Sequence, residues 1–121
     1  MGSGTTFYIE KGYKAVTVNL PKEIIKTLRV MSSRIGCRKI ELYHDIFDDF
    51  LVNLPKYDLD SYNSYNPSNP SDLTLYIKKA THVELKVFSD RKDVTLKWLV
   101  AIILTHYVNH RSAVETVEGF P

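Results

Sequence analysis

Hydrophobic and polar residues alternate along Lys14–Leu20, and this period of two predicts a β-strand with one buried face. The apolar side carries Val16, Val18 and Leu20. The other side carries Ala15, Thr17 and Asn19. One short strand cannot bury its apolar face alone, so the pattern requires a partner strand elsewhere in the chain.

Two helices are expected after this strand. Pro21 suits a helix start, and Lys22–Ile35 carries an apolar stripe at helical spacing. Gly36 is a typical residue to end such a helix. A second helical pattern runs from about Arg38 until Pro55 stops it.

The second half of the chain repeats this order. Leu73–Lys79 alternates again, with Leu73, Leu75 and Ile77 against Thr74, Tyr76 and Lys78. Thr81 and Glu84 fit a capping box that opens a helix, which the stretch SDRKD is expected to break. Thr95 is suited to cap a last helix that ends near His110.

The apolar positions of the two halves superpose without a gap. Val16, Val18 and Leu20 fall on Leu73, Leu75 and Ile77, an offset of 57 residues. Such internal periodicity usually reports repeated architecture. We therefore predict that the two strands pair antiparallel, with four helices packed over their apolar face and the polar face exposed.

The predicted organisation is one domain built from two repeats. It comprises a flexible arm (1–13), a first repeat (14–54), a linker (55–72), a second repeat (73–110) and a tail (111–121). The linker is assigned by its content of Asn, Ser, Pro and Tyr.

Composition narrows the class of protein only mildly. The chain of 121 residues is 44% hydrophobic and 25% charged, as expected for one globular domain. The net charge of +2 permits a nucleic-acid partner without requiring one. A single cysteine, Cys37, excludes an internal disulfide and favours a reducing compartment. The longest apolar run, Trp98–Leu104, is shorter than the ~20 residues that span a bilayer, so we expect a cytoplasmic protein.

The stretch KAVTVNLPKEIIKTLRVMSSRIGCRKIELYHDIFDDFL resembles the ribbon–helix–helix DNA-binding unit of the Arc and MetJ kind. The resemblance covers Lys14–Leu54 and, less closely, Leu73–His110, where Lys78 replaces the proline and Asp93 replaces the glycine. It implies a mainly α fold with a two-stranded antiparallel β-ribbon. The two repeats in one chain are similar to the tandem, TraY-type version, a pseudo-dimer.

The resemblance also implies functional residues. In this family the exposed ribbon face enters the major groove, so the base-reading residues would be Ala15, Thr17, Asn19, Thr74, Tyr76 and Lys78. Phosphates would be held at the starts of the second helices and beside the ribbon, by Lys14, Lys22, Arg38, Lys39, Lys79, Thr95 and Lys97. Because the two strands differ, the DNA site is expected to be asymmetric.

We therefore expect a sequence-specific double-stranded DNA-binding protein. It would act as a transcriptional regulator or repressor, or as an accessory protein of a plasmid or phage, with several copies associating on DNA. It needs no cofactor, membrane or small-molecule substrate. The alternative is a protein-interaction module of the antitoxin type, in which the arm and linker grip a partner.

Other candidate chemistry is weaker. His106 and His110 have a spacing that can hold zinc, but no third ligand suggests itself. The carboxylates of Asp45, Asp48 and Asp49 are interpreted as a solvated helix face. No nucleophile–base pair is evident, so an enzyme is not expected.

Overall fold

The computed structural model describes residues 11–36, 38–53 and 70–117, with side chains up to residue 110. The elements, in order, are β1 (Tyr13–Pro21), α2 (Lys22–Ile35), α3 (Lys39–Val52), β2 (Pro70–Lys78), α4 (Lys79–Lys92) and α5 (Leu96–Val117). The described part of the chain is therefore mainly helical with one two-stranded sheet, as the sequence predicts.

The two strands pair antiparallel, which confirms the partner predicted for the first strand. Thr17 lies opposite Thr74 at the centre of the register, and Pro21 lies opposite Pro70 at one end. Both strands extend beyond the predicted bounds, but Lys79, predicted to end the second strand, is the first residue of α4. Proline is tolerated here because each strand of a two-stranded ribbon is an edge strand.

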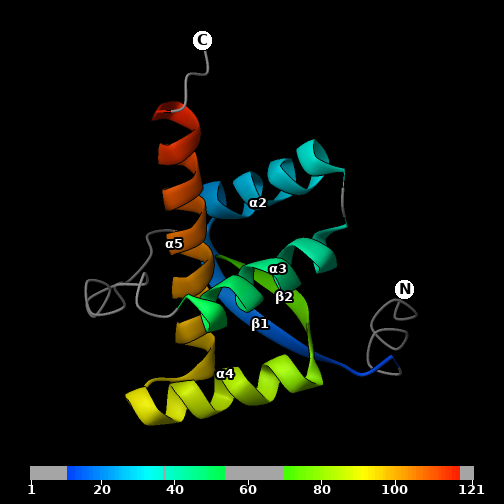
Figure 1. Ribbon diagram of the computed structural model, residues 1–121, viewed down its shortest axis with the longest axis vertical. Helices are drawn as coiled ribbons and strands as arrows, with labels where there is room; N and C mark the ends of the chain where they lie inside the picture. The colour runs from blue at the N-terminus through cyan, green and yellow to red at the C-terminus, as the bar shows by residue number, and fades with distance from the viewer. Residues whose placement is uncertain (1–10, 37, 54–69, 118–121) are drawn as a thin grey trace.

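The helices are arranged so that each half of the chain covers the strand of the other half. Figure 1 shows α2 and α4 at opposite ends of the ribbon, with α3 crossing in front of it and α5 running along one side. Among the described elements, α3 packs against β2, whereas α5 packs against β1. Neither half buries its own strand alone, so the hydrophobic core belongs to both.

The core contains the apolar ribbon face and the inner faces of the helices. Val16, Val18, Leu20, Leu75 and Ile77 are buried as predicted, whereas Leu73 is half-buried. At ~1.5–3 kcal/mol for each fully buried aliphatic side chain, these residues contribute substantially to folding. An edge-to-face contact between Phe50 and Phe88, with ring centroids 5.2 Å apart, joins α3 to α4.

The turns inside the two halves have the same backbone conformation. Gly36 ends α2 with φ 70°, and Asp93 ends α4 with φ 58°. Both residues therefore adopt the left-handed conformation that ends many helices. After the second turn, the Thr95 hydroxyl accepts a hydrogen bond from the backbone N–H of Trp98 at 3.1 Å, which confirms Thr95 as the cap of α5.

Equivalent strands and helices of the two halves begin at the same offset of 57 residues that relates their apolar positions. Tyr13–Pro21 and Pro70–Lys78 begin and end 57 residues apart, the separation of Thr17 from Thr74. Lys22–Ile35 and Lys79–Lys92 do the same. The strand and first helix of each half therefore have equal lengths, although the halves share few residue identities.

Of three predictions about helix ends, two are wrong and one is confirmed. Thr81 and Glu84 do not open a helix, because α4 follows β2 without a break and Lys78 is its N-cap residue. The SDRKD stretch ends α4 as predicted, because the helix stops at Lys92 and Asp93 is its C-cap residue. Ser89 is still helical, and its hydroxyl donates to the carbonyl of Lys86 at 2.8 Å. The last helix continues past His110 to Val117, into the segment predicted to be a loose tail.

Several predicted segments lie outside the described residues. These are most of the arm, Cys37, most of the linker and the last four positions, at 1–10, 37, 54–69 and 118–121. Among the helices that are described, none combines the length and the apolar character needed to cross a membrane.

Candidate functional site

The side of the ribbon opposite the core is a polar surface, here called the polar face. It is formed by Tyr13, Ala15, Thr17 and Asn19 of β1 and by Asp72, Thr74, Tyr76 and Lys78 of β2. Tyr13 and Tyr76 are half-buried and the others are exposed. All six residues predicted to read bases therefore lie on one accessible face, because side chains two apart along a strand point the same way.

A hydrogen bond joins the two strands at the centre of this face. The hydroxyl groups of Thr17 and Thr74 lie 2.8 Å apart, and either one can be the donor. A hydroxyl carries one hydrogen and two lone pairs, so the pair still offers a donor and acceptors to a ligand. The contact also fixes the two side chains relative to each other.

The two ends of the polar face differ in charge. Asn19 lies opposite Asp72 at one end, whereas Ala15 lies opposite Tyr76 and Tyr13 opposite Lys78 towards the other. Sequence reasoning missed Tyr13 and Asp72, which it had assigned to the arm and the linker. The signal was present, since both residues continue the alternation of their strands by one further step.

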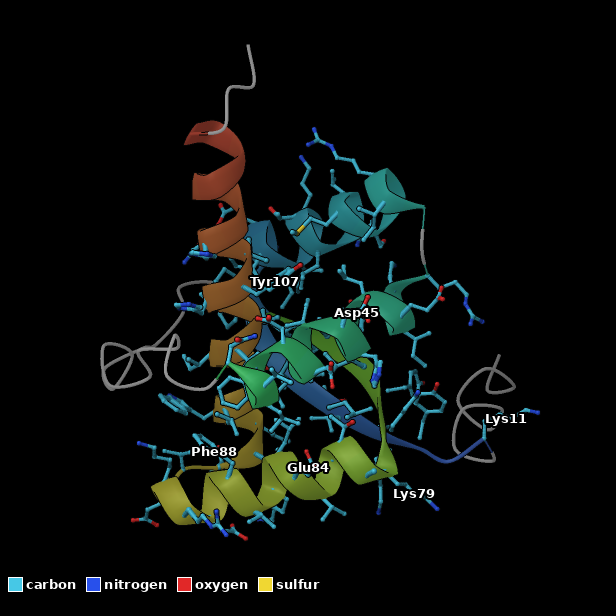
Figure 2. All side chains as sticks on the ribbon, in the orientation of Figure 1. Lys11, Asp45, Lys79, Glu84, Phe88 and Tyr107 are labelled. Carbon is cyan, nitrogen blue, oxygen red and sulfur yellow. The ribbon has the colours of Figure 1, made fainter. Side chains whose placement is uncertain are left out.

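Lysine side chains gather at the end of the ribbon where β1 begins. Lys14, Lys78 and Lys79 are exposed there, and the backbone N–H of Lys79 donates to the carbonyl of Gly12 at 3.0 Å. Figure 2 shows Lys11 and Lys79 at this same end. Partial burial lowers the pKa of the nearby His82, and the charges of Lys14 and Lys86 lower it further. Lys22 lies apart from this group, beside Pro21 at the opposite end of the ribbon.

The start of α3 carries its own carboxylate. The backbone N–H and the guanidinium Nε of Arg38 both donate to Glu41 Oε1, at 2.9 and 3.3 Å. The backbone hydrogen bond is the larger cause, and the guanidinium the next, of a lowered pKa for Glu41. Glu41 thus occupies part of the position where a phosphate would meet this helix start, and sequence reasoning missed it. Lys39 is exposed beside it.

The start of α5 has a different character. Thr95 satisfies the backbone N–H of Trp98 without adding a negative charge, and the first turn of α5 contains no acidic residue. Lys97 is exposed in the same turn. Because the exposed N–H groups of a helix start attract anions, this end offers a more favourable phosphate position than the start of α3.

The remaining candidates form no site in the described part of the chain. The rings of His106 and His110 stack with centroids 6.1 Å apart, but no group of three or more His, Cys, Asp or Glu residues gathers there or elsewhere among the described residues. Asp45, Asp48 and Asp49 are exposed on α3.

Comparison of the chain with protein-family models, with curated proteins and with solved structures finds no match in any of the three. The features of the molecule that indicate a function are therefore the geometry and chemistry of the polar face and of the two helix starts.

Proposed function

We propose that this protein binds double-stranded DNA in a sequence-specific manner by inserting its β-ribbon into the major groove. The observation that carries the proposal is the division of the ribbon, whose apolar side is buried beneath helices while its polar side is exposed along both strands. The major groove is wide enough to admit a two-stranded ribbon.

The fold in this proposal is a tandem ribbon–helix–helix unit, with both halves of a pseudo-dimer in one chain. The 57-residue spacing of the elements supports it, because Thr17 pairs with the residue at its own equivalent position, Thr74. Such a pair is expected where a two-fold axis crosses a ribbon. The packing of α3 on β2 and of α5 on β1 supports it as well.

The chemistry of the polar face fits base recognition. An asparagine such as Asn19 can pair with adenine through two hydrogen bonds, and a lysine such as Lys78 can donate to guanine. Asp72 can accept a hydrogen bond from the amino group of cytosine. Since these residues are not repeated between the strands, the two half-sites on DNA should have different sequences.

Phosphate contacts would hold the ribbon in position. Lys14 and Lys79 supply positive charge at one ribbon end, and the start of α5 supplies N–H groups beside Lys97. The start of α3 binds a phosphate less well in this proposal, because Glu41 already accepts hydrogen bonds there. Anchoring is therefore stronger on one side of the DNA site than on the other.

A protein of this kind acts by occupying the groove. It would work in the cytoplasm as a transcriptional repressor, or as an accessory protein at a plasmid or phage sequence. One pseudo-dimer covers only a short site, so several copies are expected to bind side by side. A titration of one DNA site that saturates without cooperativity at a single copy would contradict this last point.

The proposal is tested by selecting a preferred duplex from a random pool and measuring its affinity as a function of salt. The logarithm of the binding constant should fall with log salt by about 0.9 for each phosphate contact. Asn19→Ala and Lys78→Ala should each cost ~1–3 kcal/mol and relax the base preference.

The matched controls are Asn109→Ala and Lys86→Ala, which remove the same exposed residue types from α5 and α4. They should leave the base preference unchanged. If the ribbon variants behave like these controls, the ribbon does not read DNA, and a protein-interaction module becomes the better proposal.

A further inference from the structure

A hollow of about 510 Å³ opens between the end of α2, the first turns of α3 and strand β2. Its volume lies within the ~300–1,000 Å³ range that is typical of small-molecule sites. Its lining comes from the consecutive helices α2 and α3 and from the distant strand β2, so its walls are held by the hydrophobic core and not by one loop.

The walls of the hollow are mainly apolar with a few polar groups. The residues that determine its chemistry are Arg38, Lys39, Ile40, Tyr43, Thr74 and Tyr76. Two of these side chains are aromatic rings, and two are cations from the start of α3. A site with this composition suits a ligand with a flat apolar body and one negative charge.

We propose that this hollow binds a small aromatic carboxylate. The rings of Tyr43 and Tyr76 provide surfaces for the aromatic body, and Lys39 provides charge for the carboxylate. Tyr43 is buried, and like any tyrosine it is protonated at neutral pH, so its hydroxyl can donate a hydrogen bond. Burial raises the pKa of this phenol further. Arg38 contributes positive charge at the rim, although its Nε already donates to Glu41.

The second half of the chain does not repeat this chemistry. The positions equivalent to Ile40 and Tyr43 are Lys97 and Val100, at the same offset of 57 residues. The valine brings neither a ring nor a hydroxyl to its side of the ribbon. One ligand per chain is therefore expected, and Lys97 provides a matched control for Lys39.

The ligand would also affect DNA binding, and this part of the inference depends on the proposed function. Thr74 and Tyr76 line the hollow and also belong to the polar face. A ligand beside them fixes their positions and adds negative charge next to the place where DNA phosphates would lie. Occupancy should therefore weaken the binding of the duplex.

The site is tested without DNA by calorimetric titration of the full chain with 2-naphthoate and with the uncharged 2-naphthalenemethanol. We expect saturable binding of one naphthoate and weaker binding of the alcohol. Lys39→Gln should weaken naphthoate binding by up to about fivefold, as for an exposed charge pair, and leave the alcohol unaffected. Lys97→Gln should change neither.

Two further variants test the hollow itself. Ile40→Trp should fill it and abolish binding, with the circular dichroism spectrum confirming that the chain is folded. Tyr43→Phe keeps the ring, removes only the hydroxyl and should weaken naphthoate binding by about tenfold or less, the loss of one hydrogen bond. Absence of saturable binding overturns the site, as does binding that Lys39→Gln and Tyr43→Phe both leave unchanged. Equal binding of the acid and the alcohol overturns the preference for an anion.

The coupling is tested by titrating the selected duplex with and without saturating 2-naphthoate. We expect a several-fold loss of duplex affinity, and Ile40→Trp should abolish this effect of the ligand. If calorimetry shows binding but duplex affinity is unchanged, the coupling is overturned and the ligand site stands. If the chain binds no duplex at all, the proposed function fails, and the ligand site is decided by calorimetry alone.

Discussion

The two halves of the chain place a strand and two helices in the same order but build them from different residues. In each half a strand leads into a helix of equal length, a residue in the left-handed conformation ends that helix, and a second helix follows. Gly36 ends the first helix in one half, and Asp93 does so in the other. The comparison teaches that the spacing of apolar positions determines this architecture, whereas the turn and cap residues can be exchanged.

The halves differ most on the surfaces that face solvent. The start of α3 is capped by the carboxylate of Glu41, and the start of α5 by the hydroxyl of Thr95. The polar face carries Ala15 and Asn19 on one strand, where the other has Asp72 and Tyr76 at the equivalent positions. A shared core with unlike surfaces suits an asymmetric binding partner. Four predictions test this comparison of the two halves.

The largest effect is expected from the shared core. Phe47 and Leu104 occupy equivalent positions and are both fully buried. Phe47→Ala should lower the free energy of unfolding by ~3–5 kcal/mol, and Leu104→Ala by ~2–5 kcal/mol. Because the halves interlock, each variant should unfold in one transition in urea, followed by circular dichroism. Val52→Ala, at a side chain that is 73% exposed, serves as the control. Two separate transitions would show that the halves are independent.

The next effect concerns the difference between the strands. The double variant Asp72→Ala with Tyr76→Asn gives β2 the same Ala, Thr and Asn order that β1 has. Duplex selection with this variant should return a more palindromic sequence than with the wild-type chain. Each changed base contact should alter the free energy of duplex binding by ~1–3 kcal/mol, and the base preference should change only in the half-site that β2 reads. An unchanged, asymmetric preference would mean that these side chains do not contact bases.

A smaller effect is expected at the two turns. Gly36 has φ 70°, so Gly36→Ala should cost about 1–2 kcal/mol, although open space surrounds the added methyl group. Asp93→Gly should change the free energy of unfolding by less than about 1 kcal/mol, since it removes strain but adds freedom to the unfolded chain. Denaturant unfolding measures both. If both variants changed the free energy of unfolding equally, this would contradict the view that Gly36 adopts the left-handed conformation without strain and Asp93 with strain.

The smallest effect is a difference between the two helix caps in how their contribution to stability depends on pH. Thr95→Ala should cost about 1 kcal/mol at every pH, because a hydroxyl cap does not titrate. Glu41 has a lowered pKa, so its contribution is present above the ordinary value of 4.5 and is lost as the pH falls through the folded value. The stability difference between the wild-type chain and Glu41→Gln should therefore shrink on acidification. A difference that grows in acid would contradict this assignment.

Much of the fold follows from patterns that the sequence displays. The strands, their pairing, the helix Lys22–Ile35 and the cap at Thr95 follow from periodicity and local chemistry. The start of α4 did not, because Thr81 and Glu84 imitate a capping box inside a helix that the preceding strand has already positioned. The extension of α5 to Val117 was not predicted, although Ala113, Val114 and Val117 are apolar at helical spacing.

The candidate site was predictable only in part. Strand alternation places the six predicted base-reading residues on one face, and continuing it would have added Tyr13 and Asp72. The carboxylate of Glu41 at the start of α3 depends on a side-chain conformation that spacing does not specify. The hollow beside β2 depends on how α2 and α3 pack against a strand distant in sequence, which a single sequence does not reveal.

The most direct test of the central proposal is methylation protection of a selected duplex by dimethyl sulfate. This reagent attacks guanine N7 in the major groove and adenine N3 in the minor groove, so it reports which groove the protein occupies. A ribbon in the major groove should protect guanine N7 within the site and leave adenine N3 reactive, and Lys78→Ala should restore reactivity at one guanine. Protection of adenine N3 alone, or of neither position despite binding, would contradict insertion of the ribbon.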